Sequence, residues 1–156
     1  MIPRQLVDFV HGPVLGWIGG RDERLRPLAA WTFGARVEAA ADTITVFLPD
    51  CEGGPLLAKL AADGTIAITV ADGISHESYQ FKGKLIETRP TTEEERAVQD
   101  ILRSKLITYM AMFPEALFQG YTLYPSTAVS IRVAEVFNQT PGPGAGRLVD
   151  LSELAD

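Results

Sequence analysis

The feature that most constrains the fold is a pair of strand-like segments between Asp63 and Glu87, separated by a short polar link. Thr65 to Val70 is apolar and β-branched without a breaker, and Ser78 to Ile86 alternates apolar with polar residues. Such alternation is typical of a strand with one buried and one exposed face. The link contains Asp72-Gly73, a pair that tolerates the positive φ of a tight turn. The segment therefore predicts a β-hairpin.

An isolated hairpin is marginally stable in water and needs further strands beside it. Four more segments have strand character: Val14 to Ile18, Leu25 to Phe33, Thr43 to Leu48 and Thr127 to Phe137. Gly34 interrupts the second of these, and Ala35 to Ala40 is interpreted as its continuation beyond a bulge or bend. Helices are too few for a βαβ series. The order therefore predicts a mainly β chain of the α+β class, built as a six-stranded antiparallel barrel flanked by helices.

Three helices are expected around these strands. Pro3 to Val10 forms a short one, and a second begins at Leu56, after the breakers of Pro49 to Pro55. The third is long, and Thr92 with Glu95 forms its capping box. Its apolar stripe is predicted to comprise Val98, Ile101, Leu102, Leu106 and Tyr109.

Composition narrows the class of protein. A chain of 156 residues with 46% hydrophobic residues fits one globular domain, and a net charge of −6 argues against a general nucleic-acid binder. The only cysteine is Cys51, so an intrachain disulfide and a cysteine-based zinc site are excluded. No apolar run reaches the roughly 20 residues of a membrane span, and the N-terminal apolar run is too short for a secretory signal. We expect a cytoplasmic protein without membrane contact.

Several motifs that bind cofactors or metals elsewhere are incomplete here. Gly16 to Gly20 precedes another strand, and Gly142 to Gly146 lies too near the end for a βαβ unit, so neither predicts a nucleotide loop. His11 and His76 stand far apart in sequence and predict no metal site. Cys51 is flanked by two carboxylates that oppose thiolate formation, so a loop cysteine is expected.

The stretch from Pro49 to Pro55 allows two interpretations. As a strand-to-helix connection it can present the backbone amides of Gly53, Gly54 and Leu56 to an anion. It can equally be a plain loop, and its two acidic residues weaken the anion-binding interpretation. The sequence leaves both open.

The succession of segments resembles a known family. HGPVLGWIGGRDERLRPLAAW is followed by TITVFLP, LLAKLAADGTIAITV, SYQFKGKL and VFNQTPGPGAG. From about Asp8 to Gly146 this order resembles the pyridoxamine 5'-phosphate oxidase-like, FMN-binding split-barrel proteins. The resemblance implies a split-barrel, flavin-binding-like domain over residues 1–146, with a C-terminal tail over 147–156.

The resemblance also implies a homodimer with FMN bound between the two barrels. Implied ring contacts come from the second strand and the hairpin: Ala30, Trp31, Thr32 and Gln80. Implied neighbours of the ribityl-phosphate arm come from the end of the third strand and the helix after it: Leu48, Pro49, Gly53, Gly54 and Lys59. No catalytic residue is assigned, because in such proteins the flavin performs the transfer.

Two functions of different classes follow. The first is an FMN-dependent oxidoreductase acting on a small molecule. The second is a dimeric binding or stress-related module that has kept the barrel and lost the flavin, which the acidic run Asp50 to Gly54 favours. Haem handling is a third possibility, and it requires His11 or His76 as the iron ligand.

Overall fold

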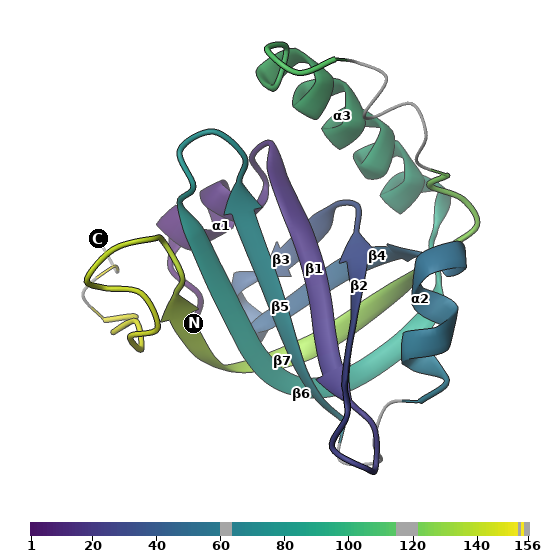
Figure 1. Cartoon of the computed structure of the whole chain (residues 1–156), viewed down its shortest axis with the longest axis horizontal. Helices are drawn as coiled ribbons and strands as arrows, with labels where there is room; N and C mark the ends of the chain where they lie inside the picture. Colours follow the sequence, from purple (N-terminus) through teal and green to yellow (C-terminus); the bar gives the residue numbers. More distant parts are fainter. Residues whose placement is uncertain (60–63, 115–121, 153, 155–156) are drawn as a thin grey trace.

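The expected hairpin lies in the middle of one antiparallel sheet in the computed structural model, which describes residues 1–59, 64–114, 122–152 and 154 (Figure 1). Its strands are β5 (Thr65–Asp72) and β6 (Ser78–Pro90). The other strands are β1 (Val14–Arg21), β2 (Pro27–Thr32), β3 (Ala35–Glu38), β4 (Thr43–Pro49) and β7 (Ser126–Asn138). The helices are α1 (Arg4–Val10), α2 (Asp50–Leu57) and α3 (Glu93–Tyr109), with the 3-10 turn η1 (Ala39–Ala41).

The turn of the hairpin differs in detail from the expectation. The positive φ falls on His76, at 63°, and the side chain of Asp72 organises the turn. Its Oδ1 accepts hydrogen bonds from the amides of Ile74 at 2.7 Å and Ser75 at 2.9 Å. An Asx turn of this kind replaces part of the backbone ladder, so the hairpin closes without a glycine in the left-handed region.

The sheet closes on itself near Phe33. Its order is β2-β1-β5-β6-β7-β4-β3, with antiparallel neighbours throughout. The two edge strands are consecutive in the chain. The Phe33 amide donates to the Phe47 carbonyl at 2.7 Å, and the Phe47 amide donates to the Gly34 carbonyl at 3.1 Å. The predicted antiparallel barrel is confirmed, but it has seven strands because the second predicted strand is divided here into β2 and β3.

Two glycines allow the strands to bend. Gly34 has a φ of 96°, and a Cβ there would lie 2.9 Å from Cδ2 of Phe47. Gly83 lies at a register shift between β6 and β7, where a Cβ would collide with the backbone carbonyl of Arg132. Side chains are therefore excluded at both points, and the bends place the two ends of the sheet together.

Helix α2 begins earlier than the sequence indicated. The stretch read as a loop is helical from Asp50, and Pro55 lies inside the helix. Gly53 is buried against the side chain of Leu48, which leaves no room for a Cβ. The helix contacts both β2 and β4, two strands that the sheet order leaves unpaired with each other (Figure 1). The gap between β2 and β4 is the split of the barrel, and α2 fills it. Packing against these two strands overrides the low helix propensity of Gly-Gly-Pro.

Helix α3 carries the predicted capping box and a charged anchor. The Thr92 side chain accepts from the Glu95 amide, and Glu95 Oε2 accepts from the Thr92 amide at 2.8 Å. The same carboxylate receives two hydrogen bonds of 2.7 Å from the Arg89 guanidinium. The Arg89 hydrogen bonds are the main cause that lowers the pKa of Glu95 to about 2.

The predicted apolar stripe of α3 is correct only in part. Leu102 and Leu106 are buried with Met110, against Phe33 and Leu123. The other three predicted residues stay exposed: Val98 (40%), Ile101 (56%) and Tyr109 (38%). The buried face instead begins with two polar residues, Glu95 and Gln99. Because α3 lies along one side of the barrel, it covers a narrower strip than a wholly packed helix.

The main core fills the barrel. Its fully enclosed side chains are Ile18, Ile44, Val46, Leu48, Ile68, Phe81, Val129 and Ile131. Burial of each such side chain contributes about 1.5–3 kcal/mol. None of the described helices is long and apolar enough to cross a membrane.

The chain after β7 returns to the barrel. Leu148 forms a bridge with Phe137, and the Val149 amide donates to the Val136 carbonyl at 2.8 Å. Val149, Leu151 and Leu154 pack against the main core. The stretch 147–152 therefore contacts the sheet next to β7.

Candidate functional site

Two neighbouring rows of side chains run across five strands and face opposite ways. The inner row comprises Ala30, Ile18, Ile68, Phe81 and Val136, which the strand registers place opposite one another. Each is at most 6% exposed. Because strand residues alternate between the faces, the adjacent row must point out of the barrel.

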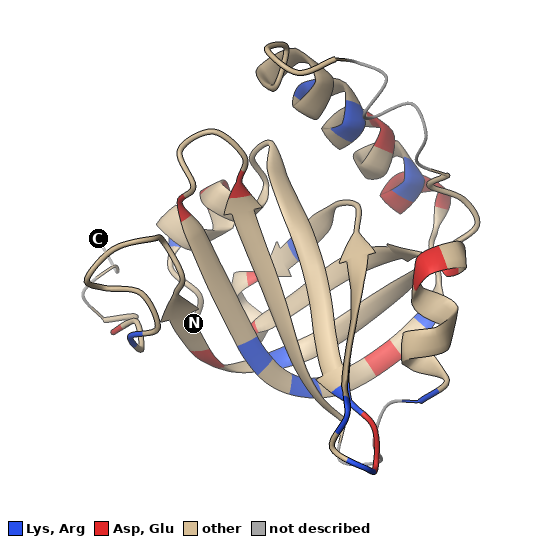
Figure 2. Cartoon of the chain, in the orientation of Figure 1, with Lys and Arg blue, Asp and Glu red and all other residues tan. Residues whose placement is uncertain are grey.

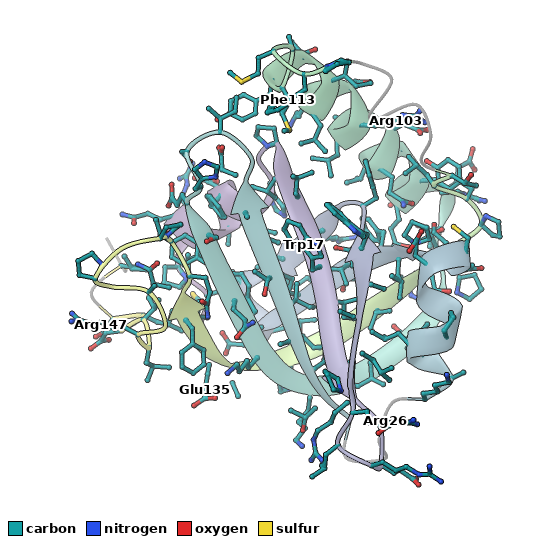
Figure 3. The ribbon with its side chains drawn as sticks, in the orientation of Figure 1. Trp17, Arg26, Arg103, Phe113, Glu135 and Arg147 are labelled. Carbon is teal, nitrogen blue, oxygen red and sulfur yellow. The ribbon has the colours of Figure 1, made fainter. Side chains whose placement is uncertain are left out.

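That outer row is Trp31, Trp17, Thr69, Gln80 and Phe137, from β2, β1, β5, β6 and β7. All five side chains are half-buried. The two tryptophan rings have their centroids 4.6 Å apart, at 43° to one another. Gln80 Nε2 donates to Thr69 Oγ1 at 3.1 Å. The row therefore joins an aromatic surface to an anchored amide, and Figure 3 shows Trp17 over the middle of the sheet.

Small residues continue this face beyond the tryptophans. Gly19, Ala29 and Ala67 lie opposite one another on β1, β2 and β5. A shallow hollow of about 410 Å³ includes Gly19, Ala67 and Lys82. The Lys82 ammonium lies 4.3 Å from the ring centroid of Phe137. The outer face is thus largely apolar and bordered by charged side chains of both signs. Lys82 lies opposite Glu135, and Figure 2 shows Lys and Arg along β6 and both kinds of charge at the β1–β2 turn.

The structure separates the nine residues expected at the site. Trp31 and Gln80 share the outer row. Five others are buried and offer no open surface to a ligand: Ala30, Thr32, Leu48, Pro49 and Gly53. Gly54 and Lys59 are exposed on and after α2. Only four of the nine are therefore accessible to a ligand from solvent.

The beginning of α2 carries negative charge. Asp50 and Glu52 both lie in its first turn, and Asp50 Oδ1 accepts from Thr127 Oγ1 at 2.7 Å. The Asp50 amide donates to the Pro125 carbonyl at 3.0 Å. Inside a helix the amides of Gly53 and Gly54 donate to carbonyls four residues earlier. The amides of Gly53 and Gly54 are therefore not free to bind a phosphate, and the two first-turn carboxylates disfavour an anion here.

Lys59 lines a different, charged hollow of about 500 Å³, whose other charged residues come from the β1–β2 turn. The hollow includes the cations of Arg24 and Arg26 and the carboxylates of Asp22 and Glu23. Asp22 accepts from the Arg26 amide at 3.0 Å and from its Nε at 2.7 Å. These hydrogen bonds lower the pKa of Asp22, and the bond from the Arg26 amide has the largest effect. Arg26, labelled in Figure 3, is thus paired with Asp22, and Lys59 and Arg24 are the other two cations that line the hollow.

The histidines and the cysteine lie apart. His11 Nε2 accepts from the Val37 amide at 3.2 Å, whereas His76 is in the β5–β6 turn. Cys51 is a free exposed thiol. Among the residues that the structure describes, no three His, Cys, Asp or Glu side chains gather as metal ligands would.

Sequence reasoning missed Trp17, Thr69 and Arg24. Trp17 lies opposite Trp31 because β1 runs on to Arg21, beyond the glycines at which the strand was expected to end. The alternation of Trp17 with the apolar Ile18 is a sequence signal that could have indicated an outward-facing tryptophan. The sequence does not show the length of the turn that sets the register between β1 and β2.

The fold is that of a split β-barrel with a helix in the split. No protein-family model and no curated protein matches the sequence. Solved structures match over most of its length. HupZ from Group A Streptococcus aligns with a TM-score of 0.55 and 16% identity, over 94% of this chain and 100% of its own.

Two further structures carry flavin-related names. An F420 reductase aligns with a TM-score of 0.51 and 10% identity, over 83% of this chain and 93% of its own. An FMN-binding protein from Syntrophomonas wolfei subsp. wolfei aligns with a TM-score of 0.51 and 12% identity, over 87% of each chain. The chain therefore shares the fold of these solved structures, the split β-barrel that the order of its segments predicted.

Proposed function

We propose that this chain binds FMN on the outer face of its barrel and acts as an oxidoreductase on a small molecule. The observation that carries the proposal is the outer row, in which the Trp31–Trp17 pair adjoins Thr69 and Gln80. Isoalloxazine is a flat ring with one apolar and one hydrogen-bonding edge, so an aromatic surface beside an amide complements it. The names of the F420 reductase and the FMN-binding protein support this assignment.

The anionic arm of FMN needs cations or several donors. At the start of α2 it would meet Asp50 and Glu52. Lys59 and Arg24 offer two cations instead, beside the turn that precedes β2. Trp31 lies roughly 13 Å along β2 from that turn, at about 3.3 Å per residue. We therefore assign the phosphate to Lys59 and Arg24.

When bound, FMN supplies hydride or electron transfer, so the chain needs no acid-base pair of its own. The residues of the chain bind the flavin and orient its ring. Trp17 and Trp31 exclude water from one side of the site. Gln80, held by Thr69, presents an amide that fixes the orientation of a polar ring edge.

The same face is proposed to pair with a second copy. Gly19, Ala29 and Ala67 leave its surface smooth, which permits two sheets to approach closely beside the tryptophans. Light scattering should give a dimer mass for the natural chain and a monomer mass for Ala67→Arg. A monomer mass for both would contradict the pairing.

Titration with FMN and with riboflavin tests the function. Ligands that bind only the folded state raise Tm, and both flavins should do so while the flavin absorption changes. Lys59→Gln should weaken FMN binding about tenfold and leave riboflavin binding unchanged, because riboflavin lacks the phosphate. Lys105→Gln, which removes an equal charge from α3 and away from the outer face, is the matched control. An unchanged Tm under saturating FMN would overturn the proposal.

The acidic start of α2 favours a second candidate, a binding module of the same fold without flavin. Here the carboxylates of Asp50 and Glu52 replace phosphate-binding groups. Asp50→Ser combined with Glu52→Lys distinguishes the candidates. If this variant gains FMN binding that the natural chain lacks, the second candidate holds and the first is rejected.

A further inference from the structure

A second concave surface lies away from the outer row. A groove of about 310 Å³ runs between the end of α1, the start of β3 and α3. Its apolar lining comprises Val10, Gly34, Ala35, Val98, Ile101 and Leu102. Val98 and Ile101 are the two predicted stripe residues that α3 leaves exposed here. Exposed apolar residues gathered in a groove of this size are typical of a binding site.

The remaining lining residues of this groove are basic: His11, Arg36 and Lys105. Arg36 Nη2 lies 3.8 Å from Glu38 Oε1, a loose pair between exposed groups. Burial lowers the pKa of His11, Asp8 opposes this, and Lys105 and Arg36 lower it further. Lys105 and Arg36 thus line the same groove as His11, and the Asp8 carboxylate acts on His11 as well. None of the described lining residues is acidic.

His11 contributes a donor as well. Its Nε2 accepts from the Val37 amide at 3.2 Å, so the neutral imidazole carries its proton on Nδ1. The groove thus combines an apolar wall with an ammonium, a guanidinium and an imidazole N–H. This set of groups complements a negative acceptor attached to an apolar body.

We propose that the groove binds a small amphipathic monoanion, a carboxylate on an apolar body of medium chain length. The apolar body packs on Val98 and Ile101, and the carboxylate pairs with Lys105 and Arg36. Charge complementarity selects this ligand, because the basic groove belongs to a chain whose net charge is −6. The groove shares no residue with the proposed flavin site.

Octanoate is the probe, with 1-octanol as its neutral counterpart and acetate as its counterpart without a chain. Calorimetric titration of the full chain should show saturable binding of octanoate only. The imidazole signals of His11 should shift with the same midpoint. His76, the only other histidine, lies in the β5–β6 turn and serves as an unmoved internal reference. Equal binding of 1-octanol, or a stationary His11, would overturn the proposal.

Two matched variants on α3 separate the groove from general charge effects. Lys105→Gln should weaken octanoate binding about three- to tenfold, the range of a partly exposed charged contact. Arg96→Gln removes an equal charge nine residues earlier, on the opposite side of the helix, and should leave it unchanged. Equal losses in both variants would reject the groove as the binding site.

Ile101→Ser tests the apolar wall and the oligomeric state together. We expect octanoate affinity to fall about threefold or more at an unchanged molecular mass. A halved mass, together with no octanoate binding by the natural chain, would instead assign the groove to contact between two copies and overturn the proposal.

Discussion

The inner and outer rows of the sheet use the same five strands and differ by a shift of one residue. The inner row, from Ala30 to Val136, is enclosed and apolar. The outer row, from Trp31 to Phe137, is half-buried and mixes aromatic rings with an amide and a hydroxyl. One face of each strand is thus available for stability and the other for binding.

Because the two faces differ in this way, stability and binding can be altered separately. Substitutions in the inner row should change the free energy of unfolding, and substitutions in the outer row should change flavin affinity. A one-residue slip in register would exchange the two faces. The bends at Gly34 and Gly83 therefore matter to binding as well as to folding.

The largest effect is expected in the inner row. Phe81→Ala leaves a cavity in the middle of the barrel and should lower the free energy of unfolding by about 3–5 kcal/mol. Phe137→Ala, in the outer row of the next strand, should lower it far less. Denaturant unfolding of both variants measures the difference. Equal losses would break the distinction between the faces.

A buried charged contact should also contribute to stability. Glu95 has a pKa of about 2 in the folded chain, below its model-peptide value, so its contribution is present above about pH 4.5 and is lost as pH falls towards 2. Glu95→Gln should remove about 2–3 kcal/mol at neutral pH and flatten the acid dependence. Glu94→Gln, exposed in the same helical turn, is the control. Unfolding curves between pH 2 and 7 that coincide for the two variants would contradict this role.

Trp31→Ala addresses the outer row directly. It should weaken FMN binding about tenfold through loss of the aromatic surface. The exposed aromatic Phe113, near the end of α3, provides the control Phe113→Ala. Flavin absorption titrations measure both affinities. An unaltered affinity in Trp31→Ala would assign the ring to another surface.

The smallest effect is expected for Gln80→Ala. One hydrogen bond contributes about 0.5–1.5 kcal/mol net, so FMN affinity should fall about three- to tenfold. The free energy of unfolding should change by less than about 1 kcal/mol, because the Gln80–Thr69 bond is only half-buried. Thr69→Val tests the anchor alone and should reproduce part of the loss in affinity. A loss of stability without a loss of affinity would give Gln80 a structural role only.

Local patterns predicted most of the fold. The hairpin, the capping box of Thr92 and Glu95, and the antiparallel barrel all follow from residues near one another in sequence. The helix at Asp50–Leu57 does not, because it depends on how Gly53 fits against Leu48. Likewise, the exposure of Ile101 depends on the side of the barrel along which α3 lies.

The candidate site was predictable to a smaller extent. The resemblance indicated Ala30, Trp31 and Thr32 together, but alternation turns Trp31 outward and its two neighbours into the barrel. The pairing of Trp17 with Trp31 depends on the turn between β1 and β2, whose conformation Asp22 sets through its bonds to Arg24 and Arg26. The site combines residues from strands that are distant in sequence. Because a sequence pattern describes each strand alone, it does not show which residues meet at the site.

The most direct test of the proposed flavin surface follows the two indole N–H signals of the chain by NMR during titration with FMN. Trp17 and Trp31 are its only tryptophans, and both belong to the outer row. Ring-current shifts are local, so both signals should move and saturate at the midpoint given by flavin absorption. Saturable FMN binding with stationary indole signals would contradict the account.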